Sequence, residues 1–101
     1  MAINKLELLR IFCAAAELGQ FHACAVKLAI SPQAVTRAIQ QLEQLTGELL
    51  FHRNTRQVRL TRFGEQLYQE GLAQLQQLEQ LLSPRQASQE FRRQIGKVDL
   101  S

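Results

Sequence analysis

The sequence predicts a mainly α-helical domain with four helices and one small two-stranded hairpin between the third and the fourth. Three observations predict this fold class. Apolar residues recur at helical spacing in four stretches, most of these stretches are bounded by capping or stop residues, and the period changes to alternation only between residues 49 and 60. The chain has 101 residues, 46% of them hydrophobic and 21% charged, which fits one globular domain.

A first helix is expected from about residue 5 to residue 18. Asn4 can cap it, Glu7 occupies the third helical position as in a capping box, and Gly19 can end it. The residues that recur at helical spacing and should face the core are Leu8, Ile11, Phe12, Ala15 and Leu18.

A second, short helix is expected from His22 to Leu28, after a loop in which Phe21 anchors the chain in the core. Its small residues, Ala23-Cys24-Ala25, permit close packing against a neighbouring helix. Ala29 and Ile30 then form a tight turn before the next helix. A helix, a turn of a few residues and a second amphipathic helix form a helix-turn-helix, whose second helix enters a DNA groove.

The third helix should start sharply, because Ser31 can cap its first turn and Pro32 suits the first helical position. It should end at about residue 45 or 46, before Gly47. One face is apolar and should pack in the core: Val35, Ala38, Ile39 and Leu42. The opposite face is polar: Gln33, Thr36, Arg37 and Gln40. Such side chains can read base edges, although a solvated surface would have the same composition.

The stretch between the third and fourth helices predicts a small hairpin. Leu49-Leu50-Phe51 and Val58-Arg59-Leu60 would be its strands, around a polar turn. Within residues 53–62, which contain no acidic residue, there are four arginines: Arg53, Arg56, Arg59 and Arg62. The net charge is +3, and this local basic patch indicates a polyanionic partner. The hairpin could lie on phosphates or enter a minor groove, or its arginines could simply be solvated.

A fourth helix should follow Thr61, which can cap it, and run from Arg62 to about Leu82, or roughly 30 Å. Ser83-Pro84 would end it, and residues 85–94 have the composition of a linker. The helix carries an apolar stripe: Leu67, Tyr68, Leu72, Leu75, Leu78, Leu81 and Leu82. A stripe of this length suggests cover by a second copy of the chain, the alternative being that it folds back on its own domain.

The remaining features give no indication of an enzyme, a cofactor or a metal site. Cys13 and Cys24 lie in apolar helical patterns, which favours buried inert thiols over a redox sensor. Neither they nor His22 and His52 have metal-ligand spacing. No secretory signal or membrane-spanning apolar run is present in the sequence, so we expect a soluble protein in the cytoplasm, without a membrane partner.

These stretches together resemble the amino-terminal DNA-binding domain of LysR-type transcriptional regulators, from about Leu6 to Leu82. The ordered matches begin with Leu9-Arg10-Ile11-Phe12, Ala15, Ala16, Gly19-Gln20-Phe21, Ala25, Leu28 and the unbroken run from Ile30 to Ile39. They continue with Leu42-Glu43, Leu45, Gly47, Leu50-Phe51, Arg53, Val58, Leu60-Thr61 and Gly64.

The resemblance implies a winged helix-turn-helix, that is, a three-helix core plus a two-stranded wing, followed by a long dimerisation and linker helix. The expected domains are residues 1–60 for DNA binding, 61–82 for the linker helix, and 83–101 for a linker and the start of an absent effector domain. Gly96-Lys97-Val98-Asp99-Leu100 resembles the opening strand of that effector domain. An effector ligand would act only through it.

Site residues follow from the resemblance position by position. The groove-facing positions are Pro32, Gln33, Thr36, Arg37 and Gln40, and the wing positions are Arg53, Asn54, Thr55 and Arg56. The positions expected to mediate dimerisation are Leu67, Tyr68, Leu72, Leu75, Leu78 and Leu82. The implied assembly is a homodimer on a pseudo-palindromic promoter site, with a tetramer possible for the full-length protein.

Two positions depart from the family's pattern. His22 and Ala23 stand where a hydroxyl residue and a basic or polar residue are common, so His22 either replaces the phosphate contact of that hydroxyl or has no role in binding DNA. His52 stands where a carboxylate is usual.

The leading hypothesis is sequence-specific binding of double-stranded DNA by a bacterial transcription regulator. The alternative is a helical module that binds a partner protein through its leucine-bearing helix. The second hypothesis predicts that the chain does not bind mixed DNA even at low salt.

Overall fold

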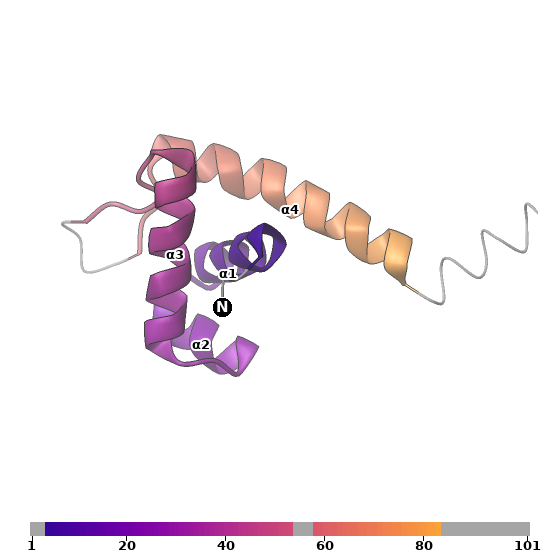
Figure 1. The fold of residues 1–101 in the computed structure, drawn as a ribbon, viewed down its shortest axis with the longest axis horizontal. Helices are drawn as coiled ribbons and strands as arrows, with labels where there is room; N and C mark the ends of the chain where they lie inside the picture. The colour runs from indigo at the N-terminus through magenta and orange to yellow at the C-terminus, as the bar shows by residue number, and fades with distance from the viewer. Residues whose placement is uncertain (1–3, 54–57, 84–101) are drawn as a thin grey trace, which may run out of the picture.

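The computed structural model describes residues 4–53 and 58–83, and four helices account for most of them. They are α1 (Lys5–Leu18), α2 (Phe21–Leu28), α3 (Pro32–Thr46) and α4 (Arg62–Leu82). The central helix is α1, which contacts each of the other three, whereas α2 also contacts α3. In Figure 1, α4 crosses α1 and continues away from the three-helix core. The mainly helical fold class is therefore confirmed.

Three helices begin at the predicted capping residues. Each cap side chain accepts a hydrogen bond from the backbone N–H group three residues further on. The bonds are Glu7 N–H to Asn4 Oδ1 (2.7 Å), Ala34 N–H to Ser31 Oγ (3.1 Å) and Gly64 N–H to Thr61 Oγ1 (2.9 Å). Gly19 and Gly47 end α1 and α3 with positive φ angles of 70° and 74°, which glycine adopts without a steric penalty.

The start of α2 differs from the prediction. The helix begins at Phe21, so Phe21 lies in its first turn and not in a preceding loop. Gln20 is the cap residue in an extended conformation, but its side chain makes no capping hydrogen bond, which explains why the sequence carried no start signal. The expected anchoring role of Phe21 holds, because its ring packs edge-on against Phe51 at 5.3 Å.

The turn between α2 and α3 depends on Ala29, which has a left-handed backbone conformation with φ of 57°. This conformation lets the N–H group of Ile30 reach back to the carbonyl oxygen of Ala25 at 3.0 Å. The turn therefore ends α2 abruptly and directs the chain into Ser31, as the helix-turn-helix arrangement requires.

The predicted hairpin has only a short region of strand pairing within the described residues. One antiparallel bridge joins Phe51 and Leu60, in place of two three-residue strands. The N–H group of His52 donates to the carbonyl oxygen of Arg59 (2.8 Å), and that of Thr61 to the carbonyl oxygen of Leu50 (3.0 Å). These bonds hold together the base of the wing, while residues 54–57 lie outside the described part of the chain.

The core is built around α1 and includes the base of the wing. Phe51 packs against Phe12 of α1, with ring centroids 5.6 Å apart, as well as against Phe21 of α2. Five large side chains are fully buried: Phe12, Ile39, Leu50, Val35 and Cys24. Because residues 50 and 51 are part of this core, the wing is anchored to the helices that carry the candidate site.

The apolar stripe of α4 divides into two parts. Leu67, Tyr68 and Leu72 are half-buried against the core, and Leu75 is only 7% exposed, so this part of the stripe packs on its own domain. In contrast, Leu81 and Leu82 at the end of the helix are 71% and 68% exposed. The first part of the stripe is therefore covered by the chain's own domain, which was one of the two expected possibilities.

Candidate nucleic-acid interface

The polar face of α3 is exposed along its whole length. The four apolar residues predicted to pack, Val35, Ala38, Ile39 and Leu42, are all buried. The four polar residues predicted to face outward are all exposed: Gln33, Thr36, Arg37 and Gln40. The amphipathic prediction for this helix is therefore confirmed.

A single shallow hollow brings these polar side chains together. Pro32, Gln33, Thr36, Arg37 and Gln40 line it, and its volume is about 430 Å³. All five residues come from one helix, so the hollow is a feature of the helix surface and not a cleft between elements. Amide, hydroxyl and guanidinium groups in such a row provide both hydrogen-bond donors and acceptors to a ligand lying along the helix.

His22 lies in the first turn of α2 and is exposed. Helix α2 packs against both α1 and α3, so this turn belongs to the same helix-turn-helix unit as the polar face of α3. The imidazole of His22 is thus open to solvent on the helix-turn-helix unit.

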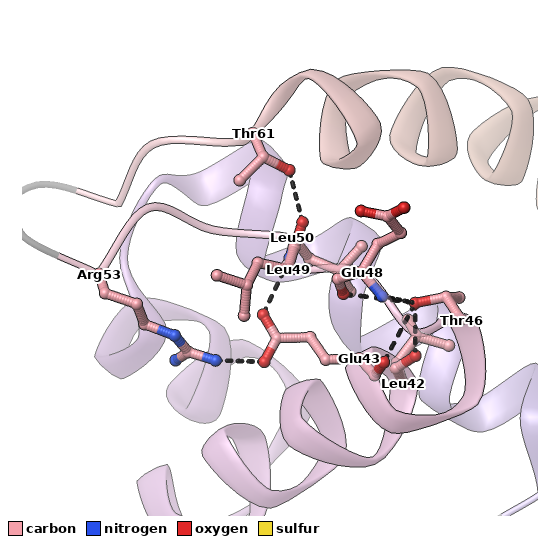
Figure 2. Close-up of polar contacts among 8 residues, drawn as sticks. All are labelled: Leu42, Glu43, Thr46, Glu48, Leu49, Leu50, Arg53 and Thr61. Carbon is pink, nitrogen blue, oxygen red and sulfur yellow. Dashed lines mark hydrogen bonds and ion pairs between the residues drawn. The ribbon is translucent and has the colours of Figure 1, made fainter.

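The wing contributes Arg53 to the described part of the site, and the predicted tip residues Asn54, Thr55 and Arg56 lie outside the described residues. Arg53 is not a free cation: its Nη2 group donates to Oε1 of Glu43 in α3, as Figure 2 shows. The Arg53 side chain is nevertheless 52% exposed. It can thus contact an external anion while remaining paired with Glu43.

Glu43 is a structural feature that the sequence analysis missed. Its side chain is only 8% exposed, and its second oxygen, Oε2, accepts a hydrogen bond from the backbone N–H group of Leu50 at 2.9 Å. The signal was present in the sequence, because Val35, Ile39 and Glu43 are spaced by four residues and so share the buried face of α3. A carboxylate at such a position needs a cation or N–H partner.

Both cysteines are buried free thiols, in agreement with the interpretation as inert residues. Burial raises the pKa of Cys13 to about 11, and the nearby Glu17 carboxylate adds to the shift. Burial also raises the pKa of Cys24, against a smaller opposing effect of Lys27. A higher pKa reduces the thiolate fraction at neutral pH, which lowers the reactivity of both thiols.

None of the helices in the described residues is both long enough and apolar enough to cross a membrane.

The comparison with known families assigns the chain to a class of proteins. Residues 6–65 match the family described as "Bacterial regulatory helix-turn-helix protein, lysR family". This match covers more than half of the chain, and the chain therefore belongs to the LysR family. It carries the DNA-binding helix-turn-helix domain of this class of transcription regulators, in agreement with the resemblance seen in the sequence.

Individual relatives agree with this assignment. The chain is 45% identical over 80 residues to the HTH-type transcriptional regulator PerR of Escherichia coli, covering 76% of this chain and 27% of PerR. It is 54% identical over 56 residues to the regulator TfdS of Cupriavidus pinatubonensis, covering 55% of this chain and 19% of TfdS. The chain thus spans about a quarter or less of the length of these relatives.

Solved structures show the same fold. The DNA-binding domain of BenM in complex with catB site 1 DNA superposes with a TM-score of 0.76 at 35% identity, covering 79% of this chain and 89% of that chain. A full-length OxyR variant from Pseudomonas aeruginosa superposes with a TM-score of 0.76 at 27% identity, covering 84% of this chain and 29% of that chain.

Proposed function

We propose that this chain binds double-stranded DNA sequence-specifically, as a homodimer, with α3 in the major groove and the wing on the backbone or in the adjacent minor groove. The observation that carries the proposal is the exposed row of Pro32, Gln33, Thr36, Arg37 and Gln40 on one face of α3. An α-helix fits the major groove of B-form DNA, where each base pair presents a distinct pattern of hydrogen-bonding groups.

The side chains of this row have the chemistry for reading bases. Arginine can form two hydrogen bonds to guanine, glutamine can form two to adenine, and threonine can contact the methyl group of thymine. Arg37 is the only cation in the row, so it has the largest expected effect on both affinity and base preference. The cap at Ser31 supports this role, because it fixes where this row of side chains, the reading face of α3, begins.

Contacts to the phosphate backbone would supply much of the affinity without selecting a sequence. We assign this role to Arg53 at the base of the wing, because its side chain is half-exposed and paired with Glu43 of α3. We include Asn54, Thr55 and Arg56 at the tip, and His22 in the first turn of α2, as further candidate contacts. The solved complexes of the BenM DNA-binding domain with DNA support the choice of partner.

Dimerisation is proposed through the exposed end of α4. Leu81 and Leu82 are large apolar residues with most of their surface in solvent, and Leu78 precedes them by one turn. A second α4 would cover them and would place two copies of α3 on the same duplex. Such a twofold dimer predicts a pseudo-palindromic promoter site.

We also propose that the chain belongs to a cytoplasmic transcription regulator without enzymatic activity.

The experiment that tests base reading is a selection of bound sequences from random DNA with the wild type and with Arg37→Ala. Loss of Arg37 should weaken binding to the selected site by roughly 1–3 kcal/mol and relax the preference at one base position. The matched control is Arg10→Ala, which removes the same charge from an exposed position on α1. Equal losses on selected and random DNA for Arg37→Ala would refute the base-reading role.

A further inference from the structure

The buried carboxylate of Glu43 connects the candidate reading helix to the wing. Its two oxygens have different partners: Oε2 accepts from the N–H group of Leu50, and Oε1 accepts from the guanidinium group of Arg53 (Figure 2). Leu50 lies in the core and Arg53 lies at the point where the wing leaves it. One side chain of α3 thus holds both the start of the wing and the first arginine of the wing.

The position of this pair relative to the reading face is given by Gln40. Gln40 lines the hollow on the reading face of α3, and it also lines a second hollow, of about 410 Å³, together with Glu43 and Gln44. Glu43 therefore lies within one helical turn of Gln40, at the carboxyl-terminal end of the reading face, and Arg53 is paired with it. A duplex along that face would bring a phosphate close to this end of α3 and the base of the wing.

A negative charge at this place should by itself disfavour DNA. The side chain of Glu43 is 8% exposed, so its charge is poorly screened by solvent, and like charges repel more strongly where the effective dielectric constant is lower. A carboxylate that does not contact DNA can favour binding only by orienting another group that does contact it. Arg53 is that group, because its guanidinium carries five N–H donors in a fixed plane and half of the side chain remains exposed.

We propose that Glu43 is a positioning residue for DNA binding, which holds the guanidinium of Arg53 in the orientation that grips a backbone phosphate beside the groove. The inference rests on the proposed function, since it assumes that the reading face meets DNA. It assigns Arg53 two simultaneous partners, a carboxylate on its protein side and a phosphate on its solvent side. Glu43 itself touches no DNA.

The test compares two variants that remove the same charge, Glu43→Gln and Glu48→Gln. Glu48 lies five residues further along and is exposed, so its loss should leave Arg53 unaffected and slightly tighten binding to DNA. Glu43→Gln keeps the size of the side chain and its acceptor for Leu50, but weakens the hold on Arg53. We expect it to bind about three- to tenfold more weakly, opposite in sign to the change for Glu48→Gln.

The measurement is the dissociation constant for a mixed-sequence duplex at about 50 mM and 200 mM salt, with each variant first shown to unfold cooperatively. A second comparison uses Arg53→Ala as the background. If Glu43 acts through Arg53, then adding Glu43→Gln to Arg53→Ala should cause no further loss of affinity. Independent losses that add together would overturn the proposal, as would tighter binding by Glu43→Gln alone.

Three further outcomes are informative. If Glu43→Gln does not fold, Arg53→Lys replaces it: lysine keeps the charge but lacks the planar fork, so binding should weaken at least threefold, and wild-type affinity would overturn the proposal. If the wild-type chain binds no DNA at low salt, the proposed function fails, and with it this inference. Wild-type binding combined with equal behaviour of Glu43→Gln and Glu48→Gln overturns the inference alone.

Discussion

At the scale of single residues, Gly64 shows how one missing side chain sets the junction between the wing and α4. A Cβ atom at this position would lie 2.2 Å from the carbonyl oxygen of Leu50, which is backbone and has little freedom to move. The same junction is held by Thr61, whose hydroxyl donates to the carbonyl oxygen of Leu49 at 2.6 Å (Figure 2). The chain can make this close approach only with glycine at position 64.

We therefore expect Gly64→Ala to lower the free energy of unfolding by about 1–3 kcal/mol, as overpacking of a close contact does. Gly71→Ala is the matched control. A Cβ there would meet the Cδ1 atom of Leu9 at 2.7 Å, the end of a flexible side chain that can rotate away. Chemical denaturation of both variants should show the larger loss for Gly64→Ala, and the reverse order would contradict this account of the junction.

Cys13 provides a prediction on the pH dependence of stability. Its pKa is about 11 in the folded protein and 9.0 for the unperturbed thiol, because burial disfavours the thiolate. The unfolded chain therefore loses this proton first. The stability contributed by the neutral thiol is present below about pH 9 and is lost as the pH rises towards 11.

Replacing Cys13 by alanine should make the decline in stability between pH 9 and 11 less steep than in the wild type. Denaturant unfolding at several pH values measures this difference, in which the titration of the other groups cancels. Parallel declines for the two proteins would show that Cys13 ionises equally easily in the folded and unfolded states.

At the scale of elements, the start of α3 determines which residues form the reading face. Ser31 accepts from the N–H group of Ala34 and Pro32 occupies the first turn, so Gln33 and Thr36 have fixed positions on the helix. If this cap is lost, the first turn can fray, and the residues nearest the start of the helix lose their fixed geometry.

Ser31→Ala should cost about 1 kcal/mol of folding free energy, measured by thermal or chemical unfolding. Ser31→Asp is the control that separates helix capping from DNA contact. Aspartate can cap the helix, so the stability of Ser31→Asp should be near the wild-type value, whereas its negative charge should lower the affinity for DNA. If Ser31→Asp has both wild-type stability and wild-type affinity for DNA, this end of α3 does not approach the phosphate backbone.

At the scale of the whole molecule, the two parts of the apolar stripe on α4 have different environments. Its first part closes the core, and Leu75 in particular packs on its own domain although it was predicted to face a partner. Only the end of the helix retains the large exposed apolar surface that a second copy would cover. The proposed dimer interface therefore rests on Leu78, Leu81 and Leu82.

Leu81→Asp combined with Leu82→Asp should give a folded monomer, whereas Leu75→Asp should prevent folding, because it places a carboxylate in the core. Sedimentation together with circular dichroism distinguishes these outcomes. An unchanged dimer in the double variant would place the interface on another surface.

Local signals made most of the secondary structure predictable. Caps at Asn4, Ser31 and Thr61 and stops at Gly19 and Gly47 act within one helical turn, so a sequence window contains the whole interaction. The start of α2 was wrong by one residue, because it depends on the extended backbone of Gln20 and not on a capping side chain. The polar face of α3 was also predictable, since helical periodicity alone separates it from the buried face.

The sequence by itself determined α1, α3 and α4 with their caps and the exposed polar row on α3, because each depends on contacts between residues at most a few positions apart. Only the tertiary structure decided that Glu43 pairs with Leu50 and Arg53, that Gly64 must lie against Leu50, and that Leu75 belongs to the core. These contacts join different elements of the fold. A carboxylate, a glycine and a leucine acquire such roles only when packing brings a particular partner within reach.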